Sequence, residues 1–231
     1  MIIDSKNAIC EAIKAKRLER LIIKDTVDLD KILTVKCENN IDVEILDKAK
    51  FMQYSGNSKS NVLGVVNFSY ANIENLVNSE ERFIVLDHIQ DPQNFGAIIR
   101  AAHLFGNKNI IIAKDEQVSV TPAVVNASVG AIFYVNICRV VNLARVINLL
   151  KLNSYFIYAA DVNAEKELEN ITFSNKFAII LGSEGKGIRH LLLKKSDFIF
   201  KIKTYGNVDS LNVSQSSAII FYEVNRKLIK S

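Results

Sequence analysis

The first 70 residues alternate between helical and extended patterns of apolar positions. Ser5 is placed to cap a helix with apolar residues at helical spacing, and the run LIIK follows it as a strand. The order then repeats, with a helix over 28–39, a strand that alternates at Ile41, Val43 and Ile45, a helix over 47–54 and the apolar strand VLGVV. We predict a small α/β domain over residues 1–70.

A polar stretch separates this region from the rest of the chain. Residues 71–81 read ANIENLVNSEE, rich in asparagine and glutamate and poor in residues that can anchor a core. We predict an interdomain linker here, followed by a second domain over residues 82–231.

From residue 82 the pattern becomes strand, helix, strand, helix. The runs FIVLD, NIIIA, IFYVNI, YFIYAA, FAIILG and FIFKIK predict strands, and helices are predicted over 94–105, 122–128, 141–150, 186–194 and 212–230. Short, almost wholly apolar strands separated by helices indicate a parallel sheet covered on both faces. Ligands bind such sheets beyond the carboxyl ends of the strands, so the loops after Leu86, Leu181 and Ile202 are candidate sites.

The composition is that of a folded globular protein. Of 231 residues, 49% are hydrophobic and 23% charged. No apolar run reaches the roughly 18 residues that a membrane-spanning helix needs, and the start of the chain lacks the basic-then-apolar order of a signal peptide. We therefore expect a cytoplasmic protein without membrane contact.

The cysteines and histidines do not point to a metal site. Cys10, Cys37 and Cys138 are far apart and odd in number, so they suggest neither a disulfide framework nor a zinc site. The three histidines lack the spacing of metal ligands. We predict that the protein binds no metal.

Positive charge is concentrated in the second predicted domain. Up to residue 80 there are 11 Lys and Arg against 12 Asp and Glu, and after it 18 against 13. A phosphate-rich partner would be attracted mainly to the second part.

The first candidate loop leads into a helix with a glycine and an arginine one turn apart. In LDHIQDPQNFGAIIRAAHLFG, Gly96 and Arg100 fall on one helical face. The missing side chain at Gly96 is expected to leave space beside the guanidinium for a phosphate or ribose. The alternative is that Asp91 and Asn94 cap the helix and that Arg100 is a solvated surface residue.

The second candidate loop, IILGSEGKGI, carries glycines at 182, 185 and 187 directly after a strand. It fits neither the dinucleotide pattern nor the phosphate-binding loop pattern. Its glycines would let backbone approach a flat, neutral group such as adenine, next to Glu184. The alternative is a tight turn with Glu184 near a helix start.

The third candidate loop, IKTYGNVDSLNVSQSSAIIFYE, leads into the last helix, with Ser210 or Asn212 near its N-cap. Small residues follow at Ser214, Ser216 and Ser217 and would allow this helix to pack close to another element. The alternative is that Ser210 and Asn212 serve only to cap this helix and have no part in a site.

Together the three loops closely resemble the motifs of the SpoU, or TrmH-like, family of RNA 2′-O-ribose methyltransferases. The matching segments are DPQNFGAIIRAAHLFG, IILGSEGKGI and SLNVSQSSAIIFYE, in that order. The segments TPAVVNASVGA and VVNLARVINLL further resemble the subgroup that modifies a guanosine of 23S rRNA.

The resemblance implies an α/β fold of the SPOUT type, in which the parallel sheet of residues 82–231 carries a deep trefoil knot. It implies that residues 1–70 form an RNA-binding domain similar to a ribosomal protein. It also implies S-adenosyl-L-methionine as cofactor, RNA as partner, and a homodimer with its active sites at the subunit interface.

The family's site residues carry over by position. The catalytic ones fall on Asn94, Arg100, Glu184, Ser210 and Asn212, and the cofactor contacts on Gly182, Ile202 and Leu211. In this hypothesis Arg100 stabilises the ribose oxygen during methyl transfer, held in place by Glu184 and Asn94. Two other functions stay open: a tRNA 2′-O-methyltransferase of the same family, and a non-catalytic RNA-binding protein of ribosome assembly.

Overall fold

The structure is a computed structural model that describes residues 1–26, 41–56, 59–206 and 210–229. The helix predicted over 28–39, and Cys37 within it, lie outside the described residues. In chain order the described elements are β1 (Ile2–Ile3), α1 (Lys6–Lys14), β2 (Leu18–Lys24), β3 (Asp42–Leu46), α3 (Lys48–Ser55), β4 (Val62–Val66), α4 (Ile73–Leu76), β5 (Arg82–Asp87), α5 (Pro92–Leu104), β6 (Asn109–Ala113), α6 (Pro122–Ala127), η1 (Ala131–Tyr134), β7 (Asn136–Val140), α7 (Leu143–Leu152), β8 (Phe156–Ala160), β9 (Lys166–Glu167), η2 (Leu168–Asn170), β10 (Phe177–Gly182), α8 (His190–Lys195), β11 (Phe198–Lys201) and α9 (Val213–Ile229).

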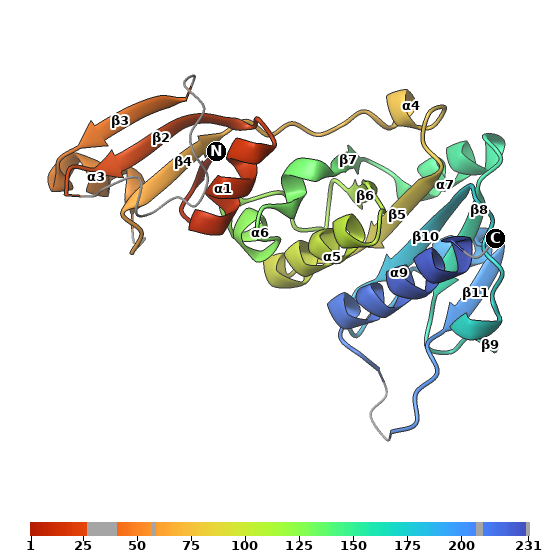
Figure 1. Cartoon of the computed structure of the whole chain (residues 1–231). Coiled ribbons are helices and arrows are strands. Elements are labelled where there is room, and N and C mark those ends of the chain that lie inside the picture. Colours follow the sequence, from red (N-terminus) through yellow and green to blue (C-terminus); the bar gives the residue numbers. More distant parts are fainter. Residues whose placement is uncertain (27–40, 57–58, 207–209, 230–231) are drawn as a thin grey trace.

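The N-terminal part forms a small mixed sheet with strand order β1-β4-β2-β3 (Figure 1). Strand β4 runs antiparallel to β1 and β2, whereas β2 and β3 are parallel. The predicted cap is present, since Ser5 accepts a hydrogen bond from the Ala8 amide. Asp47, expected within its helix, caps α3 instead by accepting a hydrogen bond from the Lys50 amide. The predicted α/β character of this part is therefore confirmed for the described residues.

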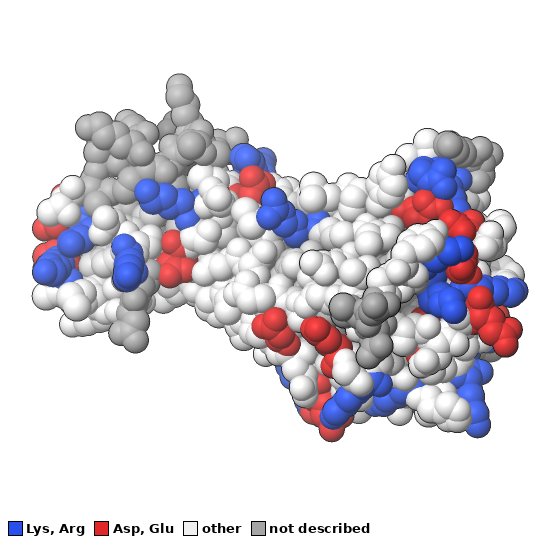
Figure 2. All heavy atoms as spheres, turned by 90° about the horizontal axis from the view of Figure 1, so that it is seen from below, with Lys and Arg blue, Asp and Glu red and all other residues white. Residues whose placement is uncertain are grey.

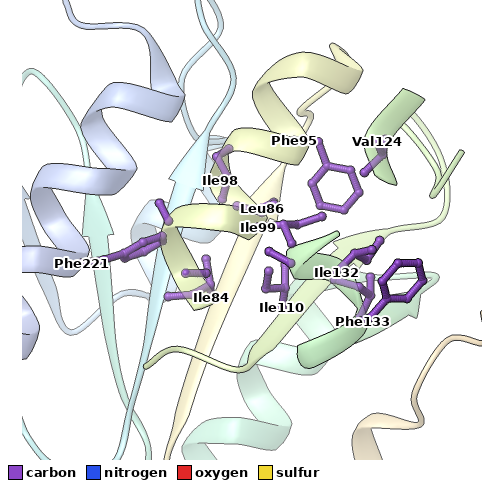
Figure 3. Close-up of a cluster of buried hydrophobic side chains, with 14 of the residues drawn as sticks. Ile84, Leu86, Phe95, Ile98, Ile99, Ile110, Val124, Ile132, Phe133 and Phe221 are labelled. Carbon is purple, nitrogen blue, oxygen red and sulfur yellow. The ribbon is translucent and has the colours of Figure 1, made fainter. Parts of the chain in front are cut away.

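The C-terminal part forms a seven-stranded sheet of order β7-β6-β5-β10-β8-β11-β9, parallel throughout. Side chains of α5, α6 and α9 belong to one buried cluster on one face, where Phe221 of α9 lies beside Ile84 of β5 and Val124 of α6 beside Phe95 of α5 (Figure 3). Helices α7 and α8 cover the other face. The predicted parallel sheet, covered on both sides, is confirmed.

Two predicted elements differ from the structure. The strand expected over 132–137 begins only at Asn136, because Gly130 turns the chain at a φ of +83° and the apolar residues after it form the short helix η1. The helix expected over 186–194 begins at His190, since the Arg189 amide donates a hydrogen bond to the Asp87 carboxylate and Arg189 is extended. Apolar spacing alone could not reveal either turn.

Helix α1 of the small sheet packs closely against the turn before η1. A Cβ added at Gly130 would lie 2.6 Å from the Glu11 Cβ and 3.1 Å from the Ala8 Cα, so only a glycine permits this approach. The apolar residues of α1 belong to the same core cluster as those of α5 and α6. The two sheets are thus joined by a continuous core as well as by the chain between them.

Polar contacts reinforce this junction. Asn126 Nδ2 donates to Asp4 Oδ1 at 2.8 Å, and the Tyr134 hydroxyl donates to Glu11 Oε2 at 2.8 Å. The hydrogen bonds from Lys14 and Tyr134 lower the pKa of Glu11, while burial raises the pKa of Tyr134 to about 12.

Gly96 lies where α5 crosses the end of α6. A Cβ at this position would be 2.4 Å from the Ala127 Cβ and 2.8 Å from the Ser128 amide nitrogen. The expectation that Gly96 leaves space for a phosphate or ribose beside Arg100 is therefore wrong, because the end of α6 fills that space. A sequence shows that a side chain is missing but not what occupies its place.

We expect the substitution Gly96→Ala to lower the free energy of unfolding. Overpacking costs about 1–3 kcal/mol, which exceeds the roughly 1 kcal/mol that alanine gains over glycine inside a helix. Urea denaturation would measure the change, with Gly206→Ala as control, because a Cβ at Gly206 meets no atom within 4 Å. Unchanged or increased stability of Gly96→Ala would contradict the close helix crossing.

Candidate functional site

The first two candidate loops leave the sheet side by side. Strands β5 and β10 are neighbours, and their last residues, Asp87 and Gly182, are paired. Between the loops opens a cavity of about 220 Å³. It is lined by His88, Ile89, Gln90, Asp91 and Asn94 of the first loop and helix, by Ser183, Glu184 and Lys186 of the second loop, and by Val213 of α9. Residues from all three candidate segments therefore meet at the carboxyl edge of the sheet.

In the first loop, capping falls to Asp91 and not to Asn94. The Asp91 carboxylate accepts hydrogen bonds from the amides of Gln93 and Asn94, at 3.0 and 3.3 Å, and Pro92 occupies the first helical position. The half-buried Asn94 lines the cavity, and its side chain makes no hydrogen bond to the described residues. It is thus available to a ligand.

The second loop closes on itself at Gly182. A Cβ there would lie 2.2 Å from the Gly187 carbonyl carbon and 2.5 Å from the Ile188 nitrogen. Ser183 and Gly187 form an antiparallel bridge, and Gly185 and Gly187 have positive φ angles of +87° and +65°. The tight turn is therefore present, but Glu184 is not near a helix start, because α8 begins at His190. The space at Gly182 is filled by the loop itself, whereas a Cβ at Gly185 or Gly187 would meet no atom within 4 Å.

Asn212 connects the third segment to the second loop. Its Oδ1 accepts hydrogen bonds from the Ser214 amide and hydroxyl, at 2.8 and 2.6 Å, so Asn212 caps α9. Its Nδ2 donates to Glu184 Oε2 at 3.2 Å. One side chain thus fixes both the start of the last helix and the only carboxylate of the glycine loop. Ser210 is exposed and hydrogen-bonds to no described residue.

Six of the eight predicted site residues are not among those that line the cavity: Arg100, Gly182, Ile202, Ser210, Leu211 and Asn212. Arg100 is exposed on α5 and makes no hydrogen bond or ion pair with the described residues. Ile202 is half-buried just after β11, and Leu211 is 36% exposed before α9. Within one chain, Asn94 and Glu184 line the cavity and Asn212 binds Glu184, whereas Arg100 makes no polar contact with any of the three.

Sequence reasoning missed an ion pair that orders this edge of the sheet. Asp87 is fully buried, and its carboxylate accepts from the Arg189 amide and Nε at 2.9 Å and pairs with Arg189 Nη2 at 2.8 Å. The pair ties the end of β5 to the segment that follows the glycine loop. The sequence did carry one signal of this pair: the acidic residue Asp87 directly follows the apolar run FIVL of β5.

His88 was also missed. It follows Asp87 directly, has a φ of +63°, and lies with Nε2 2.6 Å from Glu116 Oε2. Non-glycine residues with positive φ are uncommon, and their strain often marks functional sites. A lone histidine in sequence carried no such information.

The surroundings of the cavity are polar, and both signs of charge are present. Figure 2 shows Lys and Arg interspersed with Asp and Glu on the face that it draws, without one uninterrupted basic patch. In the described ranges, His, Cys, Asp and Glu form no group of three or more that could hold a metal ion. No helix among these residues has the length and apolar character needed to span a membrane.

Comparisons with known proteins agree with one another in matching this chain to RNA methyltransferases. The model of the SpoU rRNA methylase family matches residues 81–222. A putative TrmH family tRNA/rRNA methyltransferase of Bacillus subtilis, YacO, is 32% identical over 96% of this chain and 94% of its own length. An uncharacterized tRNA/rRNA methyltransferase of Borreliella burgdorferi is 36% identical over 93% of this chain and 94% of its own.

Solved structures share the fold over the whole chain. The SpoU methyltransferase AviRb from Streptomyces viridochromogenes, in complex with AdoMet, superposes with a TM-score of 0.82 at 19% identity, covering 100% of this chain and 91% of AviRb. An RNA 2′-O ribose methyltransferase superposes with a TM-score of 0.80 at 22% identity, covering 99% of this chain and 89% of its own.

Proposed function

Because the chain belongs to the SpoU, or TrmH, family of RNA methyltransferases, we propose that it methylates a ribose 2′-hydroxyl of RNA with S-adenosyl-L-methionine as methyl donor. The observation that carries the proposal is the cavity at which three segments far apart in sequence meet, with Asn212 hydrogen-bonded to Glu184 at its edge.

The cofactor would be held by Gly182, Ile202 and Leu211. The partly exposed apolar side chains of Ile202 and Leu211 suit an uncharged ring, and the closed turn at Gly182 offers rigid backbone. These features fit S-adenosylmethionine, which supplies a methyl group on a positively charged sulfur. Since the leaving group is neutral after transfer, the site requires no acid and no metal to expel it.

The difficult partner is the ribose hydroxyl, which is weakly acidic. The chain's own task is to position this oxygen and stabilise the negative charge that develops as its proton passes to solvent water. Arg100 supplies the positive charge, and Asn94 and Glu184 orient it and the ribose. Asn212 fixes Glu184, and Ser210 contacts the ribose. An arginine rarely loses its proton, so electrostatic stabilisation is the role assigned to Arg100.

We further propose that the protein acts as a homodimer in which Arg100 reaches the partner's cavity. In a single chain Arg100 is exposed and makes no hydrogen bond or ion pair with Glu184 or Asn212, although all three belong to the proposed site. On α5 and α9, large apolar side chains are exposed, at 67% for Leu104 and 56% for Tyr222. Such a surface favours a protein partner.

The remaining parts of the proposal concern the fold and the RNA. The sheet order places β10 between β5 and β8, and residue 212 returns to the loop after β10, an arrangement that suits a trefoil knot in a domain of residues 82–231.

The small sheet, within residues 1–70, would be an RNA-binding domain, joined through the linker 71–81. We assign a guanosine of 23S rRNA as the target and the cytoplasm as the location.

Methyl transfer to defined RNAs tests this function. We expect the purified protein to transfer tritiated methyl from the cofactor to unmodified 23S rRNA, and the product to resist alkaline cleavage at one nucleotide, because a 2′-O-methyl group removes the attacking hydroxyl. Methylation of tRNA transcripts instead of 23S rRNA would show that the substrate is tRNA. Cofactor binding without transfer to either RNA would favour a non-catalytic role in ribosome assembly.

A further inference from the structure

We propose, building on the function above, that the cavity between the first and second loops receives the base of the nucleotide whose ribose is methylated. In this assignment the ring of His88 is the stacking surface for the base, and the Ser183 hydroxyl is a hydrogen-bonding group for its polar edge.

The ring of His88 is fixed in orientation by carboxylates on two sides. Nε2 lies 2.6 Å from Glu116 Oε2, and Nδ1 lies 3.5 Å from Asp87 Oδ1. The side chain is 12% exposed and lines the cavity. With both nitrogens facing carboxylates, the flat face of the ring is what remains for a ligand. Proteins commonly receive unstacked RNA bases on such aromatic faces, histidine included.

Hydrogen bonds to the segment 117–118 fix the backbone next to His88. The Ile89 amide donates to Gln117 Oε1 at 2.7 Å, and the Val118 amide donates to the Ile89 carbonyl at 2.9 Å. This bracing holds the positive φ of His88, a backbone conformation that residues other than glycine rarely adopt. Residues held in such a conformation by their neighbours cluster at functional sites, which supports a binding role for His88.

Ser183 supplies a polar group that the protein itself leaves unsatisfied. Its Oγ is buried and has no hydrogen-bond partner among the described residues, although Ser183 lines the same cavity. A buried hydroxyl without a partner is destabilising. A ligand that offers a donor or acceptor at this point would remove that cost, and the edge of a nucleobase has both.

The size of the cavity favours a base over the cofactor. Its volume of about 220 Å³ is below the roughly 300–1,000 Å³ typical of pockets for drug-sized ligands. The proposed cofactor contacts Ile202 and Leu211 are not among its lining residues. A cavity of this size next to the cofactor site, rather than within it, suits one ring system of the RNA.

The substitution His88→Gly tests the stacking role. Glycine adopts a φ near +63° without strain, so the fold should be preserved. We expect the KM for the RNA that the unaltered protein methylates, 23S rRNA or tRNA transcripts, to rise by about 10-fold or more, as for the loss of one base–aromatic stack. Cofactor affinity, measured by calorimetry, should not change. His88→Phe, which retains a ring but neither nitrogen, should restore most of the affinity.

Ser154→Gly is the matched control. Ser154 also has a positive φ, of +65°, and is exposed in the turn between α7 and β8, at the opposite edge of the sheet. The KM of Ser154→Gly for RNA should equal that of the unaltered protein. An unchanged KM in His88→Gly, or failure of His88→Phe to restore binding, would overturn the stacking role while leaving the proposed function intact. If the unaltered protein transfers no methyl group to RNA, both the stacking role and the proposed function would be wrong.

Ser183→Ala tests the second contact. Because the hydroxyl has no partner among the described residues, its removal should not lower the melting temperature. We expect the KM for RNA to rise by roughly 2- to 10-fold, the range for one hydrogen bond. An unchanged KM would exclude the hydroxyl from base recognition.

Discussion

Arg100→Ala is expected to lower kcat by about 100- to 1,000-fold, the usual effect of removing one directed charge or donor from a site where negative charge develops. The cofactor should bind as before, because Arg100 is assigned to the ribose oxygen and not to Gly182, Ile202 or Leu211. Single-turnover methyl transfer with saturating cofactor would measure the change, and calorimetry would check cofactor binding.

Arg145→Ala is a suitable control for this substitution. Arg145 is likewise an exposed arginine on a helix, but α7 covers the other face of the sheet. It should have normal turnover. Near-normal turnover of Arg100→Ala with intact cofactor binding would show that the charge of Arg100 is not needed, and the catalytic assignment would then have to be abandoned.

The exposed position of Arg100 allows a sharper version of the experiment. If Arg100 of one subunit serves the cavity of the other, a mixed dimer of Arg100→Ala and Asn212→Ala subunits contains one site with both residues intact. Mixing the two inactive variants should therefore restore part of the activity. If Arg100 acts within its own chain, each site of the mixed dimer lacks one residue and the mixture stays inactive.

Local patterns predicted those features that depend on neighbouring residues along the chain. The apolar runs of β5, β6 and β10 are buried strands because a parallel sheet covered on both faces leaves no polar side to alternate with. Asp91 caps α5 as a short polar residue before a proline should.

Features that depend on contacts between distant segments could not be predicted in this way. Gly96 was expected to leave room for a ligand, but the end of α6 fills that space. At Gly182 the loop after β10 packs against its own glycine, a closure that the spacing of the glycines did not reveal. The Asp87 and Arg189 pair joins residues far apart in sequence, and the start of α8 shifts because of it. Arg100 lies exposed on α5, and its role in the proposed dimer depends on contacts with a second subunit that no pattern within one chain encodes.

The loop closure at Gly182 leads to the second large expected effect. In Gly182→Ala, the new Cβ would lie 2.2 Å from the Gly187 carbonyl carbon and 2.4 Å from its oxygen, distances at which the backbone has to move. Because Ser183 and Glu184 are carried by this loop, its displacement should disturb the cavity as well as the cofactor contact. We expect cofactor binding to become undetectable by calorimetry and the free energy of unfolding to fall by about 1–3 kcal/mol.

Gly206→Ala provides the comparison for Gly182→Ala, because its Cβ would meet no atom within 4 Å. It should keep the stability of the unaltered protein in urea denaturation, which would show that alanine is harmful only where a loop is packed against the glycine. If Gly182→Ala instead binds S-adenosylmethionine with normal affinity and unfolds at the normal urea concentration, the turn tolerates a side chain. The assignment of this loop to the cofactor site would then be wrong, whatever the outcome for Arg100.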